Sequence, residues 1–83
     1  MARGIYSRDR ERLLRVALRL RATARVPKLP QCDVPMCTQV AVVDGKTVYG
    51  HWAYMCPRHF RTLGVGLGLG RGQVLVLESE PLE

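Results

Sequence analysis

The sequence has few aromatic residues, no asparagine and no long hydrophobic run. Aromatic residues make up 6% of its 83 residues, so its core must come mainly from Val, Leu and Ala. A chain this short buries only about 60% of its unfolded surface, and its core is marginal unless a metal or a disulfide adds stability. It has little room to enclose a substrate pocket of roughly 300 Å³ or more. Its length therefore argues against a self-sufficient metabolic enzyme.

Segments that would carry the chain into or across a membrane are also missing. The longest aliphatic runs, residues 40–43 and 74–77, have four residues each, whereas a spanning helix needs about 20. Arginines precede the small residues Ala22-Thr23-Ala24 and interrupt the apolar region that a signal peptide would need. We therefore expect a cytoplasmic protein without a membrane partner.

Acidic residues are scarce in the first third of the chain. Residues 1–28 hold nine basic and two acidic residues, a local charge of +7, whereas residues 29–83 hold four basic and five acidic ones, a local charge of −1. All but one of those nine basic residues are arginine, whose forked guanidinium group suits phosphates and carboxylates. The asymmetry predicts a basic segment on a near-neutral module, with an anionic partner.

The three cysteines are an odd number, which argues against a framework of disulfides. Cys32 and Cys37 form a C-x4-C pair, and Cys56 and His59 form a C-x2-H pair after eighteen intervening residues. Three thiolates and one imidazole make a closed tetrahedral site for structural Zn²⁺, and metal binding supplies on the order of 10 kcal/mol of folding free energy. We expect these four residues to bind zinc. His51 is the alternative fourth ligand, and free or redox-active thiols are the alternative without a metal.

The residues around these pairs predict a β-hairpin and a short helix. The hairpin is expected over residues 38–52 with Asp44-Gly45 as a two-residue turn. The helix is expected over residues 56–63, with Pro57 at its first position and Gly64 at its end. A ligand knuckle, a hairpin and a helix in this order resemble a treble-clef zinc finger. The predicted fold class is α+β, a small zinc-stapled, treble-clef-like module preceded by an arginine-rich helix.

The segment before the ligands predicts an amphipathic helix over residues 8–26. Ser7 is a capping residue for its start, and Pro27 ends it by restricting the residue before it. At 100° per residue, four arginines fall within an arc of about 60°, and an aliphatic seam occupies another face. The arginine row consists of Arg8, Arg12, Arg15 and Arg19. The seam consists of Leu13, Ala17, Leu20 and Ala24, with Val16 beside it and with Arg10, Arg21 and Arg25 on its far side.

This arginine row predicts contact with a nucleic-acid backbone. It contains no Asn, and every Gln lies elsewhere in the chain, so it suits phosphates better than base edges. One alternative is a solvated helix that docks onto the finger by its seam. The other is a protein-interaction module that binds an acidic protein surface, with apolar contacts from Leu13, Leu14 and Leu18.

Glycines alternate with larger residues over residues 64–72. A strand there would place every side chain on one face and bare backbone on the other, and a flexible loop is the other interpretation. A phosphate-binding loop is not favoured because no Gly-Lys-Ser/Thr follows. We expect a short strand over residues 73–77 and a frayed tail after it. One domain is expected, with a helical arm at 1–29, a zinc module at 30–77 that includes the glycine-rich segment 63–73, and an acidic tail at 78–83.

The combined pattern resembles a group of small zinc-finger proteins of actinobacterial phages and their hosts. The resemblance rests on Cys32-x4-Cys37, on Trp52-x3-Cys56-x2-His59 and on the glycine run of residues 64–73. It implies a treble-clef-like fold, a bound zinc and a phage or host-regulatory setting in the bacterial cytoplasm. It attaches no activity to the chain.

Catalytic machinery is not indicated. A second, open metal site would need further ligands, and only His51 is spare, while a fully ligated zinc has no position for water. We expect a non-catalytic zinc-finger binding factor that takes no small-molecule substrate. Its partner is expected to be DNA or RNA or, in the alternative, a protein surface such as the host transcription machinery.

Overall fold

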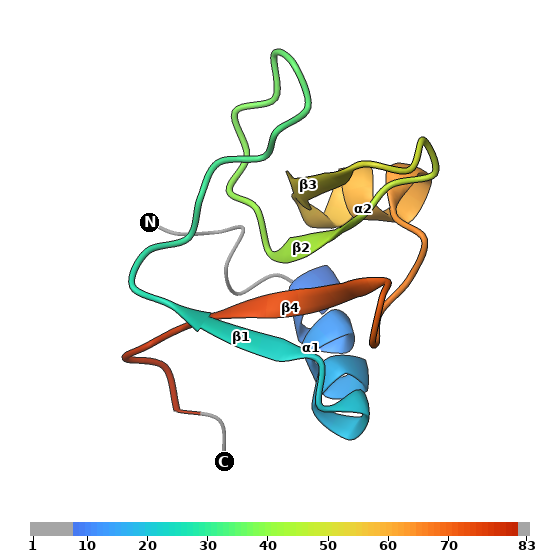
Figure 1. Ribbon diagram of the computed structural model, residues 1–83. Helices are drawn as coiled ribbons and strands as arrows, with labels where there is room; N and C mark the ends of the chain where they lie inside the picture. Colours follow the sequence, from blue (N-terminus) through green and yellow to red (C-terminus); the bar gives the residue numbers. More distant parts are fainter. Residues whose placement is uncertain (1–7, 82–83) are drawn as a thin grey trace.

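The computed structural model describes residues 8–81, which form a four-stranded mixed sheet and two helices (Figure 1). In chain order the elements are α1 (Arg8–Leu20), β1 (Thr23–Val26), β2 (Val43–Lys46), β3 (Trp52–Met55), α2 (Pro57–Leu63) and β4 (Gly72–Leu77). The expected α+β class is confirmed. Within residues 8–81, neither helix has the length and apolar character needed to cross a bilayer.

The last strand of the chain lies inside the sheet, whose strand order is β1-β4-β2-β3. β4 pairs in parallel with β1, with Thr23 opposite Val74, and antiparallel with β2, with Val43 opposite Val74. Val74, Leu75 and Val76 are at most 1% exposed. A continuous apolar run is typical of a strand that is covered on both faces. The strand expected over residues 73–77 is thus confirmed, and its composition explains its central place.

The predicted helix over residues 8–26 is wrong beyond Leu20. Arg21 adopts a left-handed conformation with φ of 55°, and the N–H of Ala22 donates to the carbonyl of Ala17 at 2.8 Å, which closes the end of α1. The chain then reverses into β1 instead of continuing as helix. The periodicity of the segment is helical throughout, but pairing with β4 satisfies its backbone groups and decides the conformation.

The hairpin of β2 and β3 forms, but its turn is not Asp44-Gly45. Both residues lie within β2, and the turn spans residues 47–51, where the N–H and Oγ1 of Thr47 both donate to the carbonyl of His51. A Cβ on Gly45 would lie 3.0 Å from the carbonyl oxygen of Arg71 and 3.1 Å from the Cα of Gly72. Glycine is therefore required at position 45 by the close approach of β4 and not by a turn.

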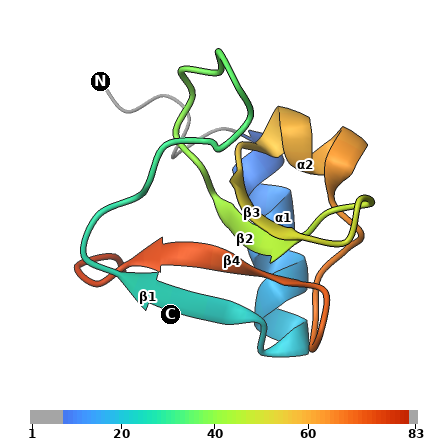
Figure 2. The same ribbon diagram turned by 45° about the horizontal axis from the view of Figure 1, so that its top comes forward.

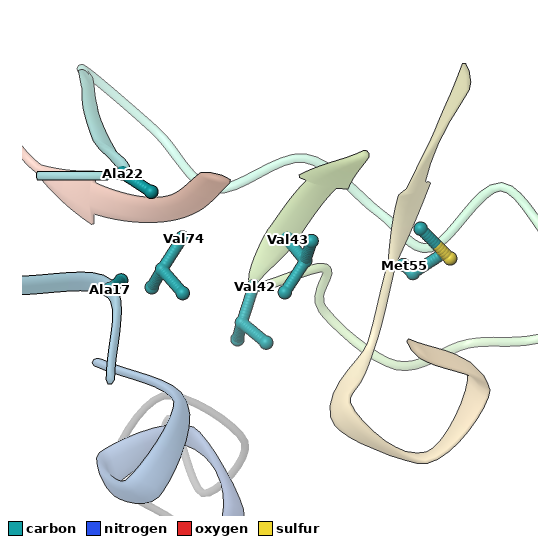
Figure 3. Packing of buried hydrophobic residues seen from close by; sticks show 6 residues of the cluster. All are labelled: Ala17, Ala22, Val42, Val43, Met55 and Val74. Atoms are coloured by element: carbon teal, nitrogen blue, oxygen red, sulfur yellow. The ribbon is translucent and has the colours of Figure 1, made fainter. Parts of the chain in front are cut away.

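Both helices pack on the same face of the sheet. Register places Val43, Met55 and Val74 on that face, and Figure 3 shows Val74 beside Ala17 of α1, with Val42 and Val43 between Val74 and Met55. Side chains of α1 and α2 complete this core, namely Leu13, Leu14, Phe60 and Leu63. In Figures 1 and 2 both helices lie behind the strands. Within residues 8–81 no helix covers the opposite face. This face is buried at Leu75 of β4 but exposed at Trp52 and Tyr54 of β3, and we call its exposed part the open face.

The buried stripe of α1 differs from the predicted seam. Ala17 is fully buried and Leu13 packs on the core, but Leu20 and Val16 are 51% and 46% exposed. The helix ends too early for Leu20 to reach the sheet. Arg10, expected on the far side of the seam, is only 4% exposed because it pairs with Glu80.

The glycine-rich segment is a loop, and residues 78–81 form an ordered turn. Gly66, Gly68 and Gly70 have positive φ values, which excludes a regular strand. Gly64 ends α2 as expected, but with φ of −76°, and a Cβ at this position would overlap the ring of Phe60. After β4 the N–H of Glu80 donates to the carbonyl of Leu77 at 2.9 Å. The interpretation of a frayed end is therefore wrong for these residues, while Leu82 and Glu83 lie outside the described part, as does Ser7.

Candidate metal centre

Four potential metal ligands converge from two separate segments. Cys32 and Cys37 lie in the long connection between β1 and β2, Cys56 directly precedes α2, and His59 lies in the first turn of α2. One ligand atom of each residue lies within 4.8 Å of the others. The prediction that these four residues lie together, able to hold a metal ion, is confirmed.

The distances within this cluster suit a tetrahedral ion. Nδ1 of His59 lies 3.3 Å from Sγ of Cys56 and 3.5 Å from Sγ of Cys32. Zinc–ligand bonds of about 2.3 Å to sulfur and 2.0–2.1 Å to nitrogen separate S and N by about 3.5 Å in a tetrahedron. All three cysteines are free of disulfides. The donor set and its spacing thus fit a single Cys3His ion.

The first ligand pair is brought together by a tight turn. The N–H of Cys37 donates to the carbonyl of Val34 at 3.0 Å, and Met36 has φ of 71°, which turns the chain back toward Cys32. The side chain of Gln31 donates to the carbonyl of Cys37 at 2.8 Å. These local hydrogen bonds bring Cys32 and Cys37 together although four residues separate them.

A reciprocal pair of hydrogen bonds ties this turn to β3. The N–H of Asp33 donates to the carbonyl of Tyr54 at 2.8 Å, and the N–H of Tyr54 donates to Oδ2 of Asp33 at 2.8 Å. Asp33 follows the first ligand, and Tyr54 precedes the third ligand by two residues. The pair therefore holds the two ligand segments in register. Asp33 is not recognisable in the sequence, because a carboxylate beside a cysteine gives no signal of its distant partner.

The second ligand pair is presented by the start of α2. Cys56 is the N-cap residue with φ of −75° and ψ of 166°, and Pro57 follows at the first helical position. The carbonyl of Cys56 accepts the first helical hydrogen bond from Phe60 at 2.8 Å. Residues three apart lie on one side of a helical turn, so Cys56 and His59 face the same ion.

The surroundings disfavour a bare thiolate at the innermost ligand. Burial raises the pKa of Cys32 to about 11, although backbone hydrogen bonds from Val34 and Cys56 act in the opposite direction. The pKa of Cys37 is lowered, first by a hydrogen bond from the backbone of Gln39. A coordinated thiol is deprotonated by the charge of the ion. A cation bound beside Cys32 would therefore stabilise its thiolate form.

The rival ligand His51 lies elsewhere. It is exposed in the turn between β2 and β3, where its carbonyl accepts from Thr47. The cluster instead contains His59. The short C-x2-H spacing, rather than the mere presence of a histidine nearby, decides which imidazole joins the cysteines.

The predicted arginine row lies on the solvent side of α1. Arg8, Arg12, Arg15 and Arg19 are all exposed. Three of them line a hollow of about 210 Å³ together with Glu11. Asp9 lies nearby, 4.0 Å from Arg12 and 3.1 Å from Arg61 of α2. The row is thus a basic surface with two acidic neighbours.

Comparisons with family models, with curated proteins and with solved structures give no match to this chain. The functional argument therefore rests on the chemistry of the cluster and of the surfaces around it.

Proposed function

We propose that the protein is a non-catalytic binding factor whose Cys3His cluster holds a structural zinc ion and whose helix α1 contacts the backbone of a nucleic acid. The zinc supplies folding free energy to a small core, and the arginine row supplies the contact surface. Each part is supported by a different set of residues.

Zinc is supported by the donor set. Three sulfurs and one imidazole nitrogen favour a soft, tetrahedral ion over Mg²⁺ or Ca²⁺, which prefer oxygen. Four protein ligands also complete the coordination of zinc and leave no position for a reacting water. The same reasoning supports a treble-clef-like arrangement, because a ligand turn, the β2–β3 hairpin and a helix that begins at the second ligand pair follow one another.

Nucleic-acid contact is supported chiefly by the hollow on α1. Arg8, Arg12 and Arg15 line it from successive turns of one helix, so three of its four lining residues are arginines and the fourth is Glu11. The opposite side of α1 packs on the core through Leu13 and Ala17, which fixes the outward direction of the row. Phosphate oxygens are the anions that forked guanidinium groups pair with best.

The test is a binding titration of the zinc-loaded chain with duplex DNA and structured RNA at several salt concentrations. The variant with glutamine at positions 8, 12, 15 and 19 should lose binding while it keeps its melting temperature. A matched variant with lysine at the same positions keeps the charge and should retain part of the affinity. Unchanged binding in the glutamine variant would overturn the proposed contact surface.

A protein partner is the second candidate, and one observation favours it. Val16, Leu18 and Leu20 of α1 are 46%, 42% and 51% exposed. At 100° per residue Val16 and Leu20 flank the arginine row on one side and Leu18 flanks it on the other, so apolar contacts are available beside the arginines to an acidic protein surface. A phage factor that docks onto host transcription machinery would use such apolar contacts. Its binding would survive moderate salt, because apolar contacts are not screened.

A further inference from the structure

The open face of the sheet carries two exposed aromatic side chains. Trp52 and Tyr54 are 49% and 39% exposed, although large aromatic residues contribute most when they are buried. They are two residues apart in β3, so both project from the same face, about 7 Å apart along the strand. The chain has few aromatic residues, so the exposure of two of them on one face calls for a physical explanation.

The register shows what surrounds the two rings. Lys46 lies opposite Trp52, and Asp44 lies opposite Tyr54 and, on its other side, opposite Gln73. Met55 and Ala53, which alternate with the aromatic pair, face the core on the helix side instead. The pair therefore forms, with Lys46, Asp44 and Gln73, a half-polar platform on the open face of the sheet.

A hollow adjoins this platform beside Trp52. Its volume is about 390 Å³, and its walls include Trp52, Gln73, Leu20, Arg21 and the loop glycines Gly68 and Gly70. Leu69, which is 104% exposed, completes this wall between Gly68 and Gly70. One indole face, one amide and one guanidinium are the chemistry that recognises a flat, polar-edged ring with an anion attached.

We propose that the open face binds single-stranded nucleic acid, with one unpaired base stacked on Trp52 in the hollow and the next base on Tyr54. Arg21 and Lys46 lie at the platform to meet the phosphates. The inference rests on the proposed function only in that its ligand is a nucleic acid, since its contact surface is not the arginine row. The ligand is specified as a single strand, because the bases of a duplex are already stacked on one another. Only an unpaired base can lie on a protein ring.

Two acidic side chains, Asp33 and Asp44, lie close to the aromatic pair. Oδ2 of Asp33 is already held by the N–H of Tyr54. Asp44 lies between Tyr54 and Gln73, two residues before Lys46 in β2 and on the same face. A carboxylate there suits the amino groups of bases, which donate hydrogen bonds, and keeps the phosphates toward Lys46 and Arg21.

The experiment uses the intrinsic fluorescence of Trp52, which is the single tryptophan of the chain. The zinc-loaded, full-length protein is titrated with oligo(dT), oligo(U) and a hairpin duplex of equal phosphate number. We expect single strands to quench the emission and the duplex to leave it nearly unchanged. Trp52→Ala and Tyr54→Ala, followed by fluorescence anisotropy of labelled oligonucleotides, should each weaken single-strand binding about tenfold or more. Trp52→Phe, which keeps a ring, should restore most of it.

The matched control is Tyr49→Ala. Tyr49 is 76% exposed in the turn between β2 and β3 but lines no part of the hollow, so its loss should leave binding unchanged. Equal melting temperatures of all variants exclude loss of fold as the cause of weaker binding. Equal weakening by the Tyr49 variant would overturn the platform as a defined site.

The outcomes separate this inference from the proposed function. If Trp52→Ala and Tyr54→Ala bind single strands like the parent while the glutamine variant of the arginine row does not, the inference is overturned and the proposed function stands. If the aromatic variants fail and the arginine variant binds, the platform is supported and the arginine row is overturned. If the parent protein binds no nucleic acid, both are overturned. A Trp52-dependent dimer that excludes oligonucleotides would also overturn the inference, because the platform would then be an interface between two copies.

Discussion

Arg10 and Glu80 are joined by two hydrogen bonds across seventy residues of sequence, from NH1 to Oε2 at 2.6 Å and from NH2 to Oε1 at 2.9 Å. NH2 also donates to the carbonyl of Leu75 in β4 at 3.1 Å. The guanidinium of Arg10 is therefore not a surface charge. It links the first turn of α1, the central strand and the turn after that strand, and it stands apart from the arginine row.

Loss of the Glu80 carboxylate should destabilise the protein. Glu80→Ala leaves the charge of Arg10 without its carboxylate in a site where the two side chains are 4% and 14% exposed. The expected loss in free energy of unfolding is about 3 kcal/mol, measured by urea denaturation of the zinc-loaded chain. Glu78→Ala is the control, since Glu78 is exposed, and its effect should stay below about 0.5 kcal/mol. Equal stability of the two variants would contradict the importance of the pair.

The same pair predicts a pH dependence. The pKa of Glu80 is lowered from its ordinary value of 4.5, first by the hydrogen bonds from Arg10. A carboxyl whose pKa is lower in the folded state stabilises the fold above its unfolded pKa, and this stabilisation is lost as the pH falls through the folded pKa. The stability difference between the parent protein and Glu80→Gln should therefore be constant near pH 6 and shrink below pH 4.5. Because both chains carry the same metal site, a difference that grows on acidification would refute this assignment.

Removal of the metal should unfold the ligand segments. A structural zinc ion contributes on the order of 10 kcal/mol to the folding of a small module, and the described core is small. We expect one zinc per chain by atomic absorption. We also expect loss of amide protection over residues 30–65 in hydrogen exchange after chelation or in Cys56→Ser.

His51→Gln is the matched control for the metal site. It should keep one zinc per chain, while His59→Gln should lower both the zinc content and the melting temperature. An apoprotein that melts at the temperature of the zinc-loaded chain would remove the case for a structural metal.

Asp33 should affect metal affinity without being a ligand. Asp33→Ala removes the acceptor for the N–H of Tyr54 and loosens the link between the two ligand segments. Partners of this kind, outside the ligand set, change metal affinity by about 10- to 100-fold when they are lost. Competition with a chromogenic chelator measures the effect. Asp33→Asn keeps an acceptor oxygen and should retain most of the affinity, and the prediction fails if the two variants bind zinc equally well.

The salt dependence of duplex binding should count the arginine contacts. Four phosphate contacts give a slope of about −3.6 in a plot of log K against log salt concentration. Each single change of Arg8, Arg12, Arg15 or Arg19 to glutamine should reduce the slope by about 0.9. Arg58→Gln, an exposed change on α2 outside the row, should leave it unchanged. A slope that does not respond to the row would indicate that other groups contact the phosphates.

The parts of the structure that depend on neighbours in sequence follow from the sequence alone. The two pairs Cys32–Cys37 and Cys56–His59 belong to this class, because the members of each pair are close in the chain and a Cys3His set is typical of a metal site. So do α2, which Pro57 and Gly64 delimit, and β4, whose apolar run requires burial on both faces. In each case the physical cause lies within a few residues, so the local pattern and the final structure agree.

Other features were decided only by contacts between distant segments. Residues 23–26 have helical periodicity, yet they form β1 because β4 offers them a hydrogen-bonding edge. Asp44 and Gly45 have the composition of a turn, yet both lie in β2, which pairs with β4. The glycine leaves room for the backbone at the start of β4, which a Cβ at position 45 would crowd. Arg10 resembles its arginine neighbours, yet it alone among them is buried, because Glu80 lies above it. Local sequence patterns determine which conformations a segment tolerates. Backbone pairing, close packing and charge pairing between distant segments select among these conformations. The energies of these long-range interactions arise only when the segments are in contact.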